Sequence, residues 1–86
     1  MAIWRIEKCK DEAGYPSNAS IYGLIREGLW TPPVKIGERS SGWPSQEVLS
    51  INSARIAGQS DEQIRELVKK LIAKRAADLA DLLATV

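Results

Sequence analysis

Apolar and polar residues alternate along the chain in a way that predicts several short helices. In RIEKCKDEA, residues 5–13, Ile6, Cys9 and Ala13 stand at i, i+3 and i+7, on one face of a short amphipathic helix. The glycine and proline of the following GYPS segment, residues 14–17, interrupt this pattern and predict a turn. Cys9 lies on the buried stripe of the predicted helix, where a lone cysteine behaves as an inert core residue.

A second helix is predicted over residues 17–27. Ser17 suits the N-cap, with Ser20 three positions later, and Gly28 suits the C′ position that ends the helix. The predicted buried stripe consists of Ile21, Leu24 and Ile25. Two helices joined by a short turn that contains glycine form an αα unit of helix-turn-helix type.

The next segment predicts a small β-hairpin. Thr31-Pro32-Pro33 excludes a helix, and the alternation over residues 34–43 then predicts two strands around the turn GERSSG. Val34, Ile36 and Trp43 are expected to point inward. Trp30 and Trp43 are more readily explained as core anchors than as stacking platforms, because burial of an aromatic ring strongly stabilises a small core. Trp4 suits either the start of the first helix or a half-exposed position.

A third helix is predicted over residues 46–57, ended by Gly58, and a fourth begins at Ser60. Ser60 and Gln63 match a capping box, and apolar residues recur at helical spacing up to residue 84. Such a helix would be ~37 Å long at 1.5 Å per residue, longer than the ~25 Å breadth of a domain this size. Its apolar stripe either completes a core too small to close alone or mediates self-association, and the sequence leaves both open.

The order of these segments predicts the fold class. It is mainly α with a small β-hairpin: a winged helix-turn-helix domain over residues 1–58, followed by a C-terminal amphipathic helix over residues 59–86. A hairpin directly after a helix-turn-helix is a wing. In this architecture the second helix enters the major groove of DNA, where short polar side chains let the backbone approach base edges and phosphates.

The candidate DNA-contacting residues lie on the outward face of residues 17–27 and on the hairpin. Asn18 pairs well with adenine, Arg26 with guanine or phosphate, and Tyr22 with phosphate oxygens. The full set is Ser17, Asn18, Ala19, Ser20, Tyr22, Gly23, Arg26, Lys35, Arg39, Ser40 and Ser41. Two alternatives stay open: Lys35 and Arg39 equally suit solvated hairpin charges, and Arg26 equally suits an ion pair.

Composition excludes several function classes. The 86 residues carry a net charge of +1, include no histidine and contain one cysteine, so no catalytic set, metal site or cofactor site is expected. We therefore do not expect an enzyme. The beginning, MAIWRIEKCKDEAG, is charged and unlike a signal peptide, and no run approaches the ~20 apolar residues that cross a bilayer. The expected compartment is the cytoplasm, with no membrane partner.

The stretch SIYGLIREGLWTPPVKIGERSSGWPSQEV resembles the AlpA family of small phage-type regulators, within the wider excisionase-like and MerR-like winged-helix group. The likeness covers roughly residues 17–70. The matching positions are Ser17, Ser20, Ile21, Tyr22, Leu24, Ile25, Glu27, Gly28, Pro33, Val34, Lys35, Ile36, Gly37, Arg39 and Trp43. Asn18 and Gly23 stand where the family usually places arginines.

The resemblance implies binding to double-stranded DNA, by the helix of residues 17–27 in the major groove and by the hairpin of residues 34–43 as the wing. The family includes activators of prophage genes and excisionases, also called recombination directionality factors, which act beside an integrase. The alternative function is an oligomeric adaptor, similar to a terminase small subunit, that recruits a larger enzyme. Residues 15–43 have a net charge of only +1, so either several protomers bind DNA together or the long helix links them.

Overall fold

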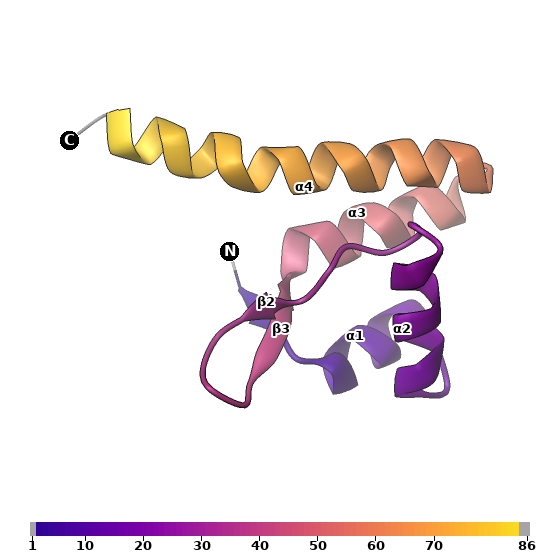
Figure 1. The fold of residues 1–86 in the computed structure, drawn as a ribbon. Coiled ribbons are helices and arrows are strands. Elements are labelled where there is room, and N and C mark those ends of the chain that lie inside the picture. Colours follow the sequence, from indigo (N-terminus) through magenta and orange to yellow (C-terminus); the bar gives the residue numbers. More distant parts are fainter. Residues whose placement is uncertain (1, 85–86) are drawn as a thin grey trace.

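The structure is a computed structural model that describes residues 2–84. These residues form four helices and a small three-stranded antiparallel sheet (Figure 1). The elements are β1 (Ile3–Trp4), α1 (Ile6–Ala13), α2 (Asn18–Arg26), β2 (Val34–Lys35), β3 (Ser41–Pro44), α3 (Ser45–Ile56) and α4 (Asp61–Ala84). The prediction of a mainly helical chain with a small β-hairpin is confirmed. Residues 85–86, the end of the predicted C-terminal segment, lie outside the described residues.

The helix boundaries follow signals that are local in the sequence. The Ser17 Oγ accepts a 3.3 Å hydrogen bond from the Ser20 backbone N–H, so the predicted N-cap of α2 is confirmed. Gly28 and Gly58, which follow α2 and α3, have φ angles of 76° and 79°, a conformation that side chains with a Cβ rarely adopt. The Ser60 capping box is also present, with Ser60 N–H donating to Gln63 Oε1 at 2.9 Å and Gln63 N–H donating to Ser60 Oγ at 3.2 Å.

The sheet contains a strand that the sequence did not predict. Its strand order is β1-β3-β2, and β1 pairs with β3 through Ile3↔Pro44 and Trp4↔Trp43. At Gly42 a Cβ atom would lie 2.7 Å from Ile3 Cγ2 and 2.8 Å from the Trp4 carbonyl oxygen. Glycine is therefore needed at this position so that β1 can approach β3.

The prediction that Ile36 points inward is wrong. Its side chain is 45% exposed, while Trp43 is fully buried and Val34 is half-buried. The alternation of inward and outward positions holds only within a strand, and β2 ends at Lys35. Ile36 belongs to the hairpin loop, which projects away from the core (Figure 1).

The core lies between the helices and the inner face of the sheet. It is formed by Cys9, Ile21, Leu29, Trp30, Trp43, Val48, Ile51, Ala54, Ile64 and Val68. Trp30 and Trp43 are core residues, as predicted, and the Trp43 Nε1–H donates to the Thr31 carbonyl oxygen at 2.7 Å. Of the predicted α2 stripe, Ile21 is fully buried, whereas Leu24 and Ile25 are half-buried. Burial, with a smaller contribution from Glu7, raises the pKa of the Cys9 thiol to about 11, so this thiol is neutral at physiological pH.

The long helix α4 packs on the core with its first half and extends beyond it with its second half (Figure 1). Ile64 is fully buried and Val68 is 4% exposed, so the first half belongs to the same core as the preceding elements. Further along, Leu79 is 57% and Leu83 is 67% exposed. The helix therefore both completes the core and leaves an apolar stripe uncovered. None of the described helices combines the length and apolar character needed to span a membrane.

A buried ion pair fixes the middle of α4. Arg75 donates from Nε and Nη2 to the two carboxylate oxygens of Glu47, over 2.7 and 2.6 Å, and the Glu47 residue is only 5% exposed. Glu47 lies in the first turn of α3, 28 positions earlier in the sequence. No spacing rule connects two residues so far apart, so the sequence did not predict this pair.

Candidate nucleic-acid interface

The two predicted halves of the interface lie on the same side of the molecule. Figure 1 shows the N-terminal end of α2 and the β2–β3 hairpin loop both on the side away from α4. The α1–α2 turn places the N-terminal end of α2 on this side, and the antiparallel pairing of β2 with β3 places the hairpin loop there. The residues predicted from two separate sequence segments are thus available to one extended partner.

The first turn of α2 is open to solvent. Ser17, Asn18 and Ala19 are exposed, and Ser20 is half-buried. The hydroxyls of Ser17 and Ser20 lie 3.1 Å apart, so one of their protons is shared between them and the other can be donated outward. The turn contains no acidic residue, and the free N–H groups of a helix N-terminus favour an anion such as phosphate.

Tyr22 connects α2 with the sheet and is also accessible. Its side chain is 41% exposed, and its ring lies against Trp43 with 6.5 Å between centroids and a 60° tilt. The sequence favoured a phosphate contact over packing beside the hairpin, and the geometry allows both, because the ring packs while the residue remains accessible. Gly23 is half-buried, and a Cβ there would make only an ordinary contact, 3.8 Å from Arg26 Nη2.

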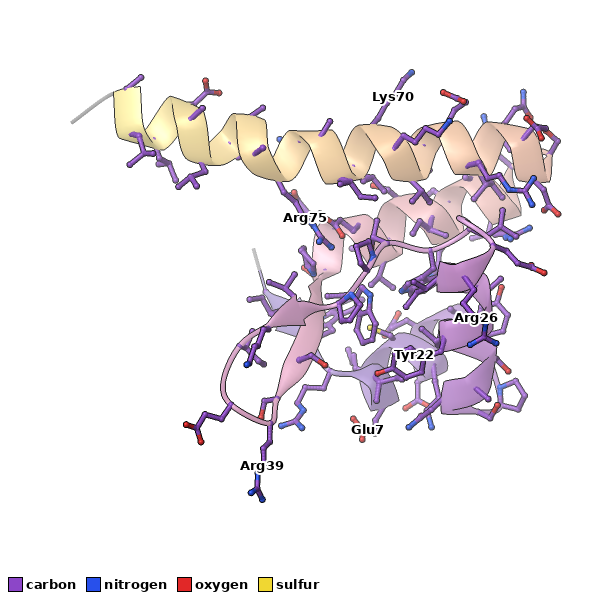
Figure 2. The ribbon with its side chains drawn as sticks, viewed as in Figure 1. Glu7, Tyr22, Arg26, Arg39, Lys70 and Arg75 are labelled. Atoms are coloured by element: carbon purple, nitrogen blue, oxygen red, sulfur yellow. The ribbon has the colours of Figure 1, made fainter. Side chains whose placement is uncertain are left out.

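The hairpin presents its two cations in different places. Lys35 is exposed on β2, where it pairs with Ser41 across the sheet, and Arg39 is exposed in the loop. Ser40 and Ser41 are half-buried, and the Ser40 carbonyl accepts a 3.0 Å hydrogen bond from Ile36 N–H that closes the loop. Arg39 therefore extends furthest from the core, as Figure 2 shows.

The cations of α2 and the hairpin lack ion pairs, unlike most of those on α4. Within residues 2–84, the side chains of Arg26, Lys35 and Arg39 form no hydrogen bond or ion pair. On α4, four of the five cations contact a carboxylate: Arg65, Lys69, Lys74 and Arg75 pair with Glu62, Glu66, Asp78 and Glu47. Of the six cations that form no ion pair within residues 2–84, three therefore lie on α2 and the hairpin, and the other three are Arg5, Lys10 and Lys70.

One residue of this side was missed by the sequence reasoning. Glu7 on α1 is exposed, and Figure 2 shows it, like Arg39 at the hairpin tip, on the side of the molecule away from α4. Its carboxylate opposes an anionic partner. The helical periodicity of α1 identifies Glu7 as an exposed position, but only the packing of α1 beside α2 and β3 brings it to this side.

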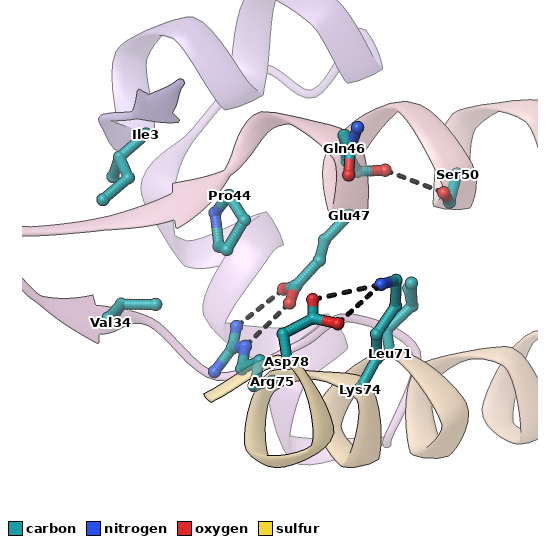
Figure 3. A pocket seen from close by; sticks show the side chains of 10 residues that line it. All are labelled: Ile3, Val34, Pro44, Gln46, Glu47, Ser50, Leu71, Lys74, Arg75 and Asp78. Atoms are coloured by element: carbon teal, nitrogen blue, oxygen red, sulfur yellow. Dashed lines mark hydrogen bonds and ion pairs between the residues drawn. The ribbon is translucent and has the colours of Figure 1, made fainter. Parts of the chain in front are cut away.

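A groove of about 420 Å³ lies on another part of the surface, between α4, the start of α3 and the edge of the sheet (Figure 3). Ile3, Val34, Pro44 and Leu71 give it an apolar lining. Its four charged residues are engaged with one another, Arg75 with Glu47 and Lys74 with Asp78, as the dashed lines in Figure 3 show. The groove therefore offers an apolar surface and no unpaired ionic group.

No group of three or more histidine, cysteine, aspartate or glutamate side chains within residues 2–84 is arranged to hold a metal ion. The candidate site with the clearest chemistry is the side of the molecule that carries the open α2 terminus and the hairpin loop. Its free N–H groups and exposed Arg39 suit an anionic polymer. No protein-family model matches the chain, and comparisons with curated proteins and with solved structures found no match.

Proposed function

We propose that this protein is a sequence-specific double-stranded DNA-binding protein of phage or mobile-element type, acting as an excisionase or as a prophage transcriptional regulator. In this proposal the fold is a winged helix-turn-helix. Helix α2 enters the major groove, and the β2–β3 hairpin is the wing beside the minor groove or the backbone. An integrase is the protein partner in the excisionase case.

One observation carries the proposal. The exposed start of α2 and the hairpin loop share the side of the molecule away from α4, and the cations of these two elements, Arg26, Lys35 and Arg39, have no carboxylate partner within residues 2–84. When an unpaired exposed cation binds a DNA phosphate, it displaces counterions that were condensed on the DNA. This release is the main source of protein–DNA affinity. Asn18 and Arg26 add side chains that can read base edges.

Three phosphate contacts give only a weak complex for one protomer. The logarithm of the binding constant would fall with the logarithm of the salt concentration with a slope of about −2.7. We therefore expect several protomers to bind neighbouring sites, spaced by about one helical turn of DNA, ~10.5 base pairs.

The experiment that tests the proposal is the selection of bound duplexes from a random-sequence pool and from source-genome fragments, at ~0.15 M salt, followed by sequencing. Enrichment of short repeats beside an integrase attachment site supports the excisionase role, and repeats upstream of a promoter support the regulator. The competing function, an oligomeric adaptor that recruits a larger enzyme, predicts no enrichment. The proposal would be contradicted if neither the random-sequence pool nor the genomic pool showed enrichment.

Arg39→Ala is expected to weaken binding to a selected duplex about tenfold and to make the salt slope about 0.9 less steep, because one phosphate contact is lost. Lys70→Ala is the matched control, since Lys70 is exposed, forms no ion pair within residues 2–84 and lies on the other side of the molecule (Figure 2). Equal effects of Arg39→Ala and Lys70→Ala would contradict this placement of the DNA.

Tyr22→Phe is expected to lower the affinity for a selected duplex a few-fold, because it removes the hydroxyl and keeps the ring on Trp43.

The uncovered stripe of α4 supports association between protomers on DNA. Ile72, Leu79 and Leu83, exposed by 40, 57 and 67%, lie roughly 70° around the helix axis from the face that packs on the core. The strip from residue 72 to residue 84 is about 20 Å long and about 10 Å wide. This is far below the roughly 800 Å² per partner of a stable interface. Association is therefore expected only where adjacent DNA sites raise the effective concentration.

Leu79→Glu is expected to abolish cooperative binding to a duplex with two sites while leaving the affinity for one site unchanged. Ala77→Glu is the matched control, because it adds the same charge on nearly the opposite face of the same helix. Both affinities are measured by titration of fluorescent duplexes that carry one or two selected sites. Cooperativity that survives Leu79→Glu would assign the protomer contacts to another surface.

A further inference from the structure

Two arginines of α4 hold the two ends of the segment that connects α2 with the hairpin. Arg65 donates from Nε to the Glu27 carbonyl oxygen at 2.9 Å, directly after α2 ends. Arg75 donates from Nη2 to the Pro32 carbonyl oxygen at 2.9 Å, two residues before β2 begins. These two arginines are ten residues apart, or about 15 Å along the helix. Helix α4 therefore spans the connection of residues 27–33 from end to end.

This connection sets the distance between α2 and the hairpin. It contains no helix or strand, and its middle enters the core through Trp30 and Thr31, which are 1% and 0% exposed. Prolines 32 and 33 remove two N–H donors at its far end, so the chain there is held through its carbonyl oxygens. At the near end Gly28 and Leu29 also donate to the carbonyls of Ile25 and Leu24, and α4 adds one donor from another element at each end.

The chemistry of Arg75 suits this role. Its guanidinium donates at the same time to both Glu47 oxygens and to the Pro32 carbonyl, and so joins α3, α4 and the connection at one point. A planar guanidinium with donors in a fixed fork orients all three partners, whereas a lysine ammonium acts as a flexible point charge. Because Glu47 is buried, its carboxylate stays in place and fixes the plane of the guanidinium.

We infer that Arg65 and Arg75 are positioning residues for DNA recognition, which fix the separation of α2 and the β2–β3 hairpin from the opposite side of the fold and do not touch DNA. The inference rests on the proposed DNA-binding function. Lys69 and Lys74 lie on the same helix but pair with Glu66 and Asp78 of α4 itself. They supply matched controls that remove the same charge from the same helix and leave the connection untouched.

The first measurement needs no DNA. Spin labels on Ala19→Cys and Glu38→Cys report the distance between α2 and the hairpin loop, and buried Cys9 is protected from labelling. We expect the distance distribution to broaden in Arg65→Met and in the double variant Glu47→Leu/Arg75→Met. This double variant removes both charges of the buried pair, which avoids leaving one carboxylate unpaired. Lys69→Met and Lys74→Met/Asp78→Leu are expected to leave the distribution unchanged. An unchanged distribution in Arg65→Met and in Glu47→Leu/Arg75→Met would overturn the inference.

The second measurement tests the consequence for DNA. In the native background Arg39→Ala is expected to weaken binding about tenfold. In the Arg65→Met and Glu47→Leu/Arg75→Met backgrounds, which themselves weaken binding, Arg39→Ala is expected to cost less than about twofold, because the hairpin no longer reaches the phosphate. Additive effects, as for independent sites, would mean that the arginines only stabilise the fold or contact DNA directly.

The two measurements separate this inference from the proposed function. If the native protein binds no duplex and the distances still broaden in the variants, DNA binding is refuted and the mechanical role of the arginines is retained. If the native protein binds DNA and the distances do not respond, the proposed function stands and the positioning role falls. Circular dichroism of every variant confirms that it is folded under the conditions of the measurement.

Discussion

Replacement of Trp43 by alanine is expected to lower the free energy of unfolding by about 3 to 5 kcal/mol. Trp43 is fully buried, packs against Tyr22 with 6.5 Å between ring centroids, and pairs with Trp4 across the sheet. The substitution would also leave the buried Thr31 carbonyl without the indole N–H that it accepts at 2.7 Å. A chain of 86 residues has a total stability of about 4 to 13 kcal/mol, so this loss is a large share of the whole.

Urea denaturation followed by circular dichroism measures the change. Trp4→Ala provides the comparison, because Trp4 lies on the neighbouring strand, is only half-buried and has the ammonium of Lys8 5.2 Å from its ring centroid. We expect Trp4→Ala to cost less than half as much as Trp43→Ala. Similar costs for the two variants would contradict the placement of Trp43 at the centre of the core.

Arg75→Met is expected to lower the free energy of unfolding by about 3 to 5 kcal/mol, an effect of the same size. The reason is the partner that remains: the Glu47 residue is 5% exposed, and without Arg75 its carboxylate would be buried with no cation beside it. A buried pair adds little net stability. Removal of one member is costly, because the remaining charge keeps its desolvation penalty and loses the attraction of its partner.

Two further variants separate this cause from the loss of a side chain. Glu47→Leu/Arg75→Met is expected to recover most of the stability, because no charge is then stranded. Lys74→Met breaks the neighbouring exposed pair with Asp78 and is expected to cost less than about 1 kcal/mol. The explanation fails if denaturation gives the double variant a stability no greater than that of Arg75→Met.

Most of the fold was predictable because its signals are local. The predicted helix boundaries lie within one residue of the observed ones, since Ser17, Gly28, Gly58 and the Ser60–Gln63 capping box act on their own turn of the chain. The burial of Trp30 and Trp43 was predictable from the size of the indole ring. The helix caps depend on neighbours within a few residues, whereas the burial of the two tryptophans follows from the apolar area of their own side chains.

The features that were not predictable depend on residues far apart in the sequence. Strand β1 has two residues, too few to show an alternation, and it forms only because β3 is available to pair with it. The Arg75–Glu47 pair spans 28 positions, and the contact of Arg75 with Pro32 spans 43. Ile36 was misplaced because an alternating pattern does not reveal where a strand stops.

The candidate site divides in the same way. The exposure of Asn18, Ala19, Arg26 and Arg39 follows from the helical and hairpin patterns, and the structure agrees. The absence of ion pairs at Arg26 and Arg39 within residues 2–84, and the approach of Glu7 to the same side, required the packing of α1 against α2 and β3. Contact of any of these residues with DNA stays a prediction.

The span of α4 across residues 27–33 also has a consequence for the order of events during translation. Ribosomes complete a chain from its N-terminus, so α2, the hairpin and the connection between them all leave the ribosome before Arg65 and Arg75 do. Ile64 and Val68, which close the core, arrive equally late. The nascent chain therefore remains without its final packing until α4 has emerged, and a stalled ribosome would display an open α2–hairpin unit to chaperones and proteases.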